Sequence, residues 1–432
     1  MPTELFISGK NWILSLAELT AYFKAREIEF EIQFFSGEFF ALSFNKDFDA
    51  SAIADLGGTI KIGEVKAKFL TETIKEAFLK KSKQAKSQIT ETMASSGLVD
   101  VITKSSNKVL FGVSVYCTES TLRSSSGLIQ RFVGSAVKDE LADLGHKSNF
   151  MGFGNERKQA QLSHVEVIKK NLVENKAEIL FCIGRTETFV AVTVAVHNPF
   201  EFQKRDIYKP NQRKIFGMPP RLARMMVNLS ACKQGKTLLD PFCGVGTILQ
   251  EALMEKAMVV GMDVNPWCVK AATENLEWLA NEYGLGDADF RVLQGDVSRL
   301  VEKMGQEAVD CIVCEPDLGP ALRQVPTGPY AEKIIQKLES LYFGFVEQAY
   351  RALKPGGRLV LVTPYMKVRS GQAVTMPIGV KLESLGFRRV YPFLKEMFAV
   401  SAGGLDHVTN AASLVEMDER HLIGREIHIV EK

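Results

Sequence analysis

The spacing of apolar residues changes along the chain and divides it into parts. In residues 3–68, strand-like stretches flank a helical one, where apolar side chains recur at Leu14, Leu16, Leu19 and Phe23. The predicted order is a strand at 5–8, a helix at 14–23, a β-rich stretch at 28–44, a short helix closing at 55–58 and a strand at 60–65. This order is typical of a small α+β unit with helices packed on an antiparallel sheet.

Residues 69–198 predict a second α+β unit. Its predicted elements are a Lys-rich helix, a strand at 109–116, a long helix at 128–144, a strand near 148–152, a helix at 164–172 and strands at 178–184 and 188–196. Residues 199–220, which begin and end with proline, are predicted to form a linker with turn and helix character.

From residue 237 onward, short apolar runs are separated by helical stretches. Strands of a parallel sheet read as continuous apolar runs because helices cover both of its faces, so this part is predicted to be α/β. The predicted strands lie at 237–241, 259–263, 290–294, 309–315 and 358–363, with a late pair near 388–393 and 426–430.

Length and composition agree with this division. The chain has 432 residues, and at roughly 150 residues per domain we expect about three units, with boundaries at 1–68, 69–200 and 201–432. With 46% hydrophobic and 24% charged residues it is typical of globular proteins, which excludes a collagen, a disordered tail protein and a membrane span. Seven cysteines without framework spacing favour a reducing cytosol, and the first residues do not read as a signal peptide, so we expect a cytoplasmic protein.

The net charge of +2 conceals an uneven distribution. Residues 1–50 carry a net charge of −4, residues 51–230 carry +10 and residues 231–432 carry −4. A basic region between acidic ones is expected where a polyanion binds, because Lys and Arg displace counterions from phosphates. A solvated polar face would leave the same pattern.

The most informative local sequence is a predicted strand that runs into a glycine turn and then a helix, Asp240-Pro241-Phe242-Cys243-Gly244-Val245-Gly246-Thr247. Glycines let a ligand approach the backbone, and the helix start offers free N–H groups. Asp263 ends the next strand, where a carboxylate can hold both ribose hydroxyls, and Asp296 with Val297 follows the third, where an adenine edge could be read. Leu249 replaces the third glycine of a dinucleotide fingerprint, so the nucleoside need not carry a pyrophosphate.

The run from Asp240 to Thr247 resembles motif I of S-adenosylmethionine-dependent methyltransferases that act on exocyclic amino groups of nucleic-acid bases. Upstream segments are similar to the stretch that joins a THUMP domain to its methyltransferase in the tRNA guanine-10 N2-methyltransferase family; they are 184–186, 191–197, 202–210, 218–224 and 228–229. The resemblance covers about residues 180–365 with specific motifs and residues 1–180 in general layout.

The resemblance implies a ferredoxin-like α+β domain, a THUMP-like domain that binds the tRNA acceptor end, and a Rossmann-like α/β methyltransferase domain. It also implies S-adenosyl-L-methionine as cofactor, tRNA as partner, and for some relatives a small activator subunit. The cofactor would be held by the following residues, with residues 216–224 wrapping it from the other side: Asp240, Phe242, Gly244, Gly246, Thr247, Asp263, Val264, Asp296 and Val297.

The target-base motif departs from the family. Relatives have Asp or Asn, two prolines and an aromatic residue after the fourth strand, whereas this chain has Glu315, Pro316, Asp317 and Leu318. Glu315 and the carbonyl of Pro316 could still accept hydrogen bonds from the amine, and we assign the catalytic site to residues 315–317. Leu318 stands where the stacking ring would be, so either Tyr330 or Tyr365 supplies a ring, the base lies differently, or the activity is lost.

Other polar residues have simpler explanations. Cys311 and Cys314 lie three apart on a predicted buried strand and point to opposite faces, so we expect buried thiols and no metal site. Cys243 is expected to be a packing residue, since methyl transfer to an amine needs no nucleophilic thiol. The linker cations, among them Arg205, Arg213 and Lys214, are candidates for contacts with RNA phosphates.

The sequence thus favours an S-adenosylmethionine-dependent RNA methyltransferase that modifies the exocyclic N2 of a guanosine in tRNA. Two alternatives remain open: an RNA-binding protein that keeps the cofactor fold but has lost or changed its transfer activity, and a DNA amino-methyltransferase.

Overall fold

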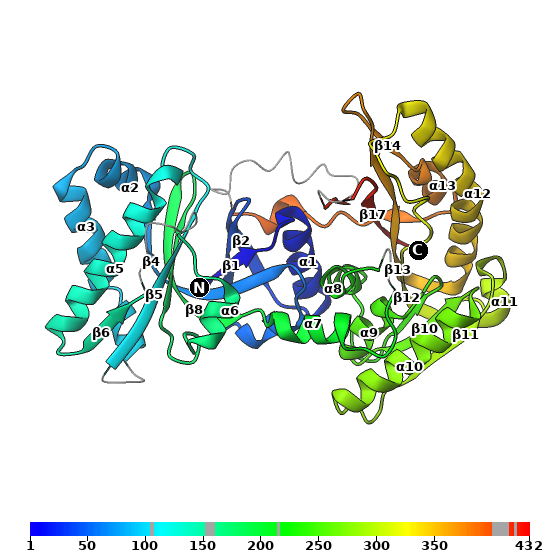
Figure 1. The fold of residues 1–432 in the computed structure, drawn as a ribbon, viewed down its shortest axis with the longest axis horizontal. Helices are drawn as coiled ribbons and strands as arrows, with labels where there is room; N and C mark the ends of the chain where they lie inside the picture. Colours follow the sequence, from blue (N-terminus) through cyan, green and yellow to red (C-terminus); the bar gives the residue numbers. More distant parts are fainter. Residues whose placement is uncertain (104–107, 152–159, 214–216, 400–413, 419–420) are drawn as a thin grey trace.

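Two β-sheets lie side by side along the long axis of the molecule, with helices α1 and α8 between them (Figure 1). The computed structural model describes residues 1–103, 108–151, 160–213, 217–399, 414–418 and 421–432. We refer to residues 1–196, which hold the first sheet, as the N-terminal half, and to residues 220–432, which hold the second, as the C-terminal half.

The N-terminal half contains one continuous sheet of eight strands in the order β2-β3-β1-β4-β8-β7-β5-β6. Its strands are β1 (Thr3–Ser8), β2 (Phe30–Phe35), β3 (Phe39–Phe44), β4 (Thr59–Leu70), β5 (Lys108–Cys117), β6 (Lys147–Phe150), β7 (Glu178–Ile183) and β8 (Glu187–Val196). The long strands β4 and β8 pair antiparallel at its centre. The predicted boundary at residue 68 lies inside β4, so the two expected α+β units share this sheet.

The helices of this half are α1 (Trp12–Ala25), α2 (Thr71–Phe78), α3 (Lys83–Ala94), α4 (Leu98–Thr103), α5 (Ser126–Asp143) and α6 (His164–Lys169), with short 3₁₀ turns η1 (Ala50–Asp55) and η2 (Arg123–Ser125). Side chains alternate along the strands: Phe6 joins the core beneath α1, whereas Leu5 and Ile7 join a smaller cluster on the other face of the sheet. Local caps set the helix starts, since the Asn11 side chain accepts from the Leu14 N–H.

Two short helices connect the halves, α7 (Pro199–Ile207) and α8 (Pro220–Leu229). Each begins with proline, which is favoured at the first helical position because its missing N–H needs no partner there. The predicted linker at 199–220 therefore contains one helix and leads into another.

The second sheet has its main strands in the order β11-β10-β9-β12-β13-β17-β15, with β14 added to β13 and β16 to β17. The strands are β9 (Thr237–Asp240), β10 (Met258–Asp263), β11 (Phe290–Gln294), β12 (Val309–Cys314), β13 (Leu353–Lys367), β14 (Ala373–Thr375), β15 (Arg388–Arg389), β16 (Leu414–Glu416) and β17 (Gly424–Glu431). The five strands from β11 to β13 run parallel and β17 is antiparallel. The strand order reverses beside β9, where doubly wound sheets bind their ligands.

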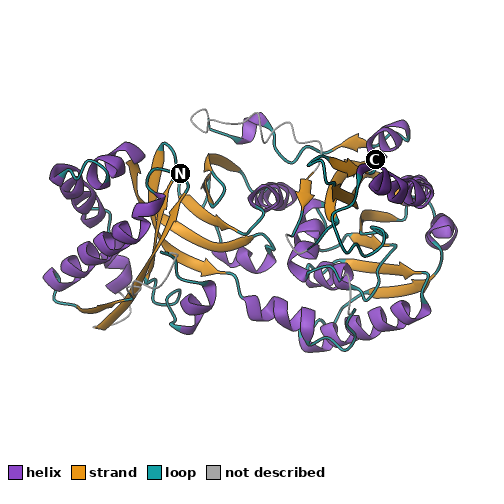
Figure 2. Ribbon diagram, turned by 45° about the horizontal axis from the view of Figure 1, so that its top comes forward, coloured by secondary structure: helices purple, strands orange, loops and turns teal. Residues whose placement is uncertain are grey.

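Helices cover both faces of this sheet (Figure 2). They are α9 (Thr247–Met254), α10 (Pro266–Glu282), α11 (Leu300–Met304), α12 (Gly328–Ala352) and α13 (Ile378–Ser384), with 3₁₀ turns η3 (Val297–Arg299) and η4 (Lys395–Met397). Neighbouring strand residues enter different cores, Leu238 toward α8 and α9 and Leu239 toward α12. The α/β prediction for this part is confirmed, and each of its five predicted parallel strands is present. The late strand near 388–393 is shorter than predicted: after Arg389 the chain continues toward Pro392, which has no N–H to donate to a ladder.

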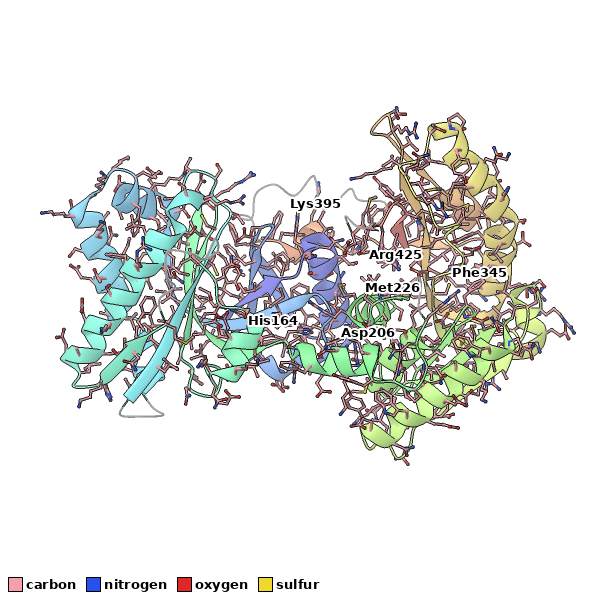
Figure 3. All side chains as sticks on the ribbon, in the orientation of Figure 1. His164, Asp206, Met226, Phe345, Lys395 and Arg425 are labelled. Carbon is pink, nitrogen blue, oxygen red and sulfur yellow. The ribbon has the colours of Figure 1, made fainter. Side chains whose placement is uncertain are left out.

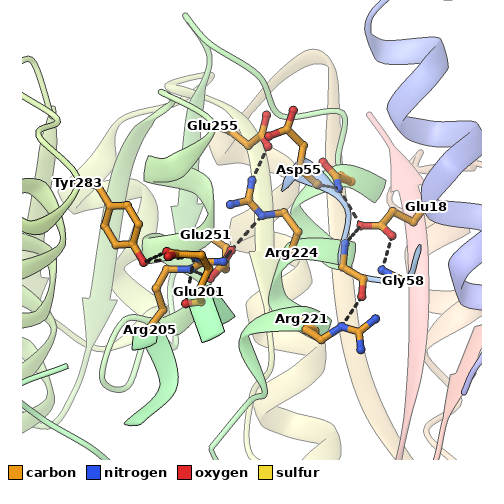
Figure 4. A network of polar contacts seen from close by, with 12 residues as sticks. Glu18, Asp55, Gly58, Glu201, Arg205, Arg221, Arg224, Glu251, Glu255 and Tyr283 are labelled. Atoms are coloured by element: carbon orange, nitrogen blue, oxygen red, sulfur yellow. Dashed lines mark hydrogen bonds and ion pairs between the residues drawn. The ribbon is translucent and has the colours of Figure 1, made fainter. Parts of the chain in front are cut away.

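A polar network joins the two halves (Figure 4). Asn228 of α8 donates to the carboxylate of Glu18 in α1 at 2.8 Å, and Arg221 donates to the Gly57 carbonyl at 2.7 Å. On the same helix α8, the buried guanidinium of Arg224 pairs with Glu251 and Glu255. Helix α8 is thus fixed by charges and hydrogen bonds on both sides.

The segment after β15 also returns to the N-terminal half. The Ala399 N–H donates to the Ile32 carbonyl at 2.9 Å, and the Phe398 ring packs edge-on against Phe35 with centroids 5.4 Å apart. Within the described residues, no helix is long and apolar enough to cross a membrane.

Candidate active site

The glycine turn after β9 is held by hydrogen bonds to the end of the neighbouring strand. Gly244 (φ +52°) and Gly246 (φ +85°) adopt left-handed conformations that favour glycine, and Gly246 caps α9. The Gly244 N–H donates to the Asp263 carboxylate at 2.9 Å, which ties the turn to the end of β10. Asp240 ends β9, is buried, and accepts from the Phe242 N–H at 3.1 Å.

This turn lines a small pocket of about 60 Å³ at the point where the strand order reverses. It is lined by Arg213, Gly217, Met218, Asp240, Phe242, Cys243, Gly244, Val245, Thr247, Ile248 and Glu315. Five residues predicted from the sequence as cofactor or catalytic residues therefore meet here: Asp240, Phe242, Gly244, Thr247 and Glu315. A larger cavity of about 620 Å³ lies elsewhere, in the N-terminal half, and five of its lining residues are acidic; such a lining disfavours a polyanion.

The pocket is acidic at its base. Burial, together with the charges of Asp263 and Glu315, raises the pKa of Asp240 well above its ordinary value. Arg213 is the basic residue that lines it, and its guanidinium lies 3.7 Å from the position that a Cβ on Gly244 would occupy. The pocket thus offers a cation opposite carboxylates.

Other predicted cofactor residues lie outside the lining of this pocket. Asp296 follows β11 and accepts from the Ser298 N–H at 2.8 Å, which lowers its pKa. Val264 is 66% exposed, whereas the side chain of Val297 packs in the core beside α12. Gly246 is the N-cap of α9, and its two chain neighbours, Val245 and Thr247, line the pocket. A ligand that extends from Asp240 along the carboxyl ends of the strands would reach Asp263 at the end of β10 and then Asp296 after β11.

Glu315, the first residue after β12, forms a two-pronged ion pair with Arg425. Nε of Arg425 donates to one carboxylate oxygen of Glu315, and Nη2 lies 3.3 Å from the other. Nη1 of the same guanidinium lies 3.1 Å from Glu416. Arg425 is 6% exposed. The sequence does not reveal this ion pair, because nothing in the motif around residue 315 indicates a partner 110 positions later.

The rest of the target-base motif forms a tight turn. Asp317 is exposed and accepts from the Gly319 N–H at 2.9 Å, so its side chain caps its own turn and does not line the pocket. Leu318 packs against the core. Tyr330 is half-exposed at the start of α12, and the aromatic ring that lines the pocket is Phe242, which packs edge-on against Phe345 at 5.1 Å.

The prediction that Arg205 contacts RNA is wrong. Its side chain is 3% exposed, and Nε donates to the buried carboxylate of Glu251 at 2.7 Å (Figure 4), so no phosphate can reach it. Lys209 is buried as well, donates to the Thr247 hydroxyl at 3.1 Å, and has a lowered pKa because of burial. Arg213 faces the pocket, and Lys214 lies outside the described residues.

The prediction that Cys311 and Cys314 are buried thiols on opposite faces of the strand is confirmed. Cys311 and Cys314 are buried and belong to different cores on opposite faces of the second sheet. Burial raises the pKa of Cys243, which disfavours a thiolate in the glycine turn. In the part of the chain that the structure describes, no cluster of His, Cys, Asp and Glu could hold a metal ion.

The fold of the C-terminal half is Rossmann-like, and part of the chain is similar to known methyltransferase domains. Residues 210–373 match the model of the RMKL-like methyltransferase domain, and residues 63–274 match that of a DNA methylase family. The solved structure of TrmN from Thermus thermophilus resembles the fold, with a TM-score of 0.54 at 17% identity over 100% of both chains.

Three of the curated relatives are RNA methyltransferases by name. The tRNA (guanine(10)-N2)-dimethyltransferase of Methanothermobacter thermautotrophicus is 38% identical over 36% of this chain and 42% of its own. That of Pyrococcus abyssi is 26% identical over 55% and 65%, and the U6 snRNA (guanine-N(2))-methyltransferase THUMPD2 of Bos taurus is 30% identical over 48% and 40%. The chain thus spans less than two thirds of the length of these relatives. The matches confirm the predicted resemblance to the tRNA guanine-10 N2-methyltransferase family.

Proposed function

We propose that the protein is an S-adenosylmethionine-dependent methyltransferase that modifies the exocyclic N2 of a guanosine in tRNA, in the cytosol. The observation that carries this is the meeting of the glycine turn after β9 with Glu315 in one pocket at the reversal of strand order. Catalysis of this kind requires a cofactor site and a hydrogen-bond acceptor for the amine at neighbouring strand ends. The names of the relatives support guanosine N2 as the target.

The residues of the pocket fit this cofactor. The Asp240 carboxyl can accept a hydrogen bond from its ammonium group, and the two glycines leave room for the cofactor against the backbone of the turn. S-adenosylmethionine supplies a methyl group on a good leaving group. We propose that Arg213 pairs with its carboxylate, because Arg213 faces this pocket beside Gly244. Asp263 would hold the ribose and Asp296, with the backbone of Val297, the adenine.

The protein's own part in transfer is positioning. The Glu315 carboxylate and the Pro316 carbonyl would accept hydrogen bonds from the amine, hold its lone pair toward the methyl group and stabilise the positive charge that forms on nitrogen. No base is needed before attack, and after transfer the methylated nitrogen releases its extra proton to solvent. Asp317 would support this arrangement by closing the turn that follows.

RNA would bind mainly through the N-terminal half and the linker, where the basic excess lies. The continuous sheet and the network around α8 would hold this surface at a fixed distance from the pocket. A small activator subunit, needed by some relatives, remains part of the proposal as a partner to be tested by co-purification.

Two experiments test the proposal. Nucleoside mass spectrometry of tRNA from a strain lacking this gene should show loss of an N2-methylated guanosine that its parent contains. In vitro, Glu315→Ala should lower transfer at least about 100-fold while binding of S-adenosylhomocysteine stays unchanged. The control Glu302→Ala, at an exposed carboxylate of α11 outside the pocket lining, should retain the activity of the wild type.

The alternatives make different predictions. The match to a DNA methylase model is the observation that favours a DNA substrate. Methyl transfer to duplex DNA instead of tRNA would support this alternative. Cofactor binding without transfer to any RNA would support a binding protein, for which the engagement of Glu315 by Arg425 is the specific observation.

A further inference from the structure

We infer that Arg425 is a positioning residue for Glu315: its guanidinium holds the Glu315 carboxylate in one orientation, so that the remaining lone pairs can accept from the target amine. This inference rests on the proposed function and assigns a role to a residue of the last strand, far from the glycine turn and the target-base motif in sequence.

The sheet explains how Arg425 reaches this place. Strand β13 lies between β12, which ends before Glu315, and β17, which carries Arg425 opposite Pro364 of β13. Arg425 lies on the side of the sheet that also holds Met226 of α8 (Figure 3), since its strand neighbours Ile427 and Ile429 join the same core as Met226. Only a long side chain can extend from β17 past β13 to the end of β12.

The two hydrogen bonds from Arg425 restrict the Glu315 carboxylate, which could otherwise rotate, to one orientation. Glu315 is one methylene longer than the Asp or Asn that the family has here, so its carboxylate has one more rotatable bond. Arg425 engages both oxygens of Glu315 in the planar fork that a guanidinium matches to a carboxylate. A lysine would provide charge but not this geometry. The fork uses one lone pair of each oxygen and leaves the others free to accept.

Arg425 is itself held from a second side. Glu416 of β16 pairs opposite Arg425 in the strand register and contacts its Nη1 at 3.1 Å. The pKa of Arg425 is raised overall, because the lowering effect of burial is outweighed by the charges of Glu315 and Glu416. Glu416 therefore stabilises the guanidinium without touching the motif.

The test measures kcat and KM for methyl transfer to tRNA with the full chain and three variants. Arg425→Met should lower kcat at least about tenfold and leave the KM for tRNA within about twofold, because the acceptor of the amine is misplaced while the RNA-binding surface is intact. Arg425→Lys should also lower kcat, because the charge remains but the two-pronged geometry is lost. The control Arg358→Met removes an ion pair with Glu431 on the same two strands, outside the pocket lining, and should leave kcat within about twofold. Calorimetry with S-adenosylhomocysteine and thermal melts accompany each variant.

Several outcomes would overturn the inference. A higher kcat in Arg425→Met would mean that Arg425 blocks the acceptor. A loss of kcat that follows the melting temperature, with a KM for tRNA that rises in parallel, would mean that its role is structural. If Arg425→Met does not fold, the folded Arg425→Lys variant decides, because full kcat there excludes a need for the fork. A wild-type protein that binds S-adenosylhomocysteine but methylates no RNA contradicts the proposed function, whereas an active wild type with a fully active Arg425 variant contradicts only the role of Arg425.

Discussion

Asn228 of α8 donates a hydrogen bond to Glu18 of α1 across 2.8 Å, and both side chains are buried. The N–H groups of Gly57 and Gly58 donate to the same carboxylate, each at 2.7 Å. This contact joins the N-terminal half to the helix that leads into the methyltransferase domain, and it places an ionisable group inside the joint. The predictions below concern this joint and the pocket that it supports.

The first prediction is a pH-dependent stability that originates at Glu18. Burial raises the pKa of Glu18 to about 7, although hydrogen bonds from Gly57, Asn228 and Gly58 oppose this. The folded state therefore binds more protons than the unfolded chain, whose pKa is 4.5, so the stabilisation is complete below about pH 4.5 and is lost as the pH rises to about 7. The full change is up to about 3 kcal/mol.

Denaturant unfolding of the wild type and of Glu18→Gln between pH 4.5 and 8 checks this. The difference between their free energies of unfolding should change across the interval, because the variant lacks this titrating group. Other raised carboxyls, such as Glu4, contribute equally to both proteins. Parallel curves would show that Glu18 keeps an ordinary pKa.

The second prediction concerns the buried charges of α8. Arg224 is 2% exposed and pairs with both Glu251 and Glu255. Arg224→Met therefore removes one of the two cations at each carboxylate and leaves Arg205 with Glu251 and Arg26 with Glu255. Breaking buried pairs in this way costs up to about 3–5 kcal/mol.

As a control, Lys204→Met removes a solvent-exposed pair with Glu282, which should change the free energy of unfolding far less. Urea titrations of the two variants, giving similar midpoints, would refute the importance of the buried network.

The third prediction tests how closely α8 approaches the loop after η1. A Cβ placed on Gly57 would lie 2.1 Å from the Arg221 carbonyl oxygen, so Gly57→Ala must displace backbone. We expect a loss of about 1–3 kcal/mol in the free energy of unfolding. The control is Gly37→Ala, whose Cβ would meet the Trp12 ring at 3.7 Å, an ordinary contact. Thermal melts of both variants decide, and equal melting temperatures would contradict the close approach.

The fourth prediction separates two roles for Arg213. If Arg213 pairs with the cofactor carboxylate, Arg213→Gln should weaken binding of S-adenosylmethionine about 10- to 100-fold. Binding of decarboxylated S-adenosylmethionine, which lacks that group, should be the same in both proteins. Calorimetry with the two ligands measures this directly. An unchanged cofactor affinity together with a weaker salt dependence of tRNA binding would instead assign Arg213 to a phosphate.

Much of the fold and part of the site were predictable because they depend on local sequence. Short apolar runs placed the parallel strands, and the glycines of residues 244 and 246 marked the turn because their left-handed backbone favours that residue. The spacing of Cys311 and Cys314 placed them on opposite faces, as period two requires of a strand. These properties depend on residues that are close to one another in the sequence.

Only the tertiary structure decided which distant groups meet. In the folded protein Arg205 pairs with Glu251, so this cation, which the charge pattern suggested as a contact for RNA, is not available to bind it. Arg425 reaches Glu315 across strand β13, which lies between their strands. The tertiary structure also merged the first two predicted units into one sheet through β4. The physical reason is common to all three: net charge and apolar spacing record what each residue is, whereas burial and pairing depend on which strands and helices come to lie beside it.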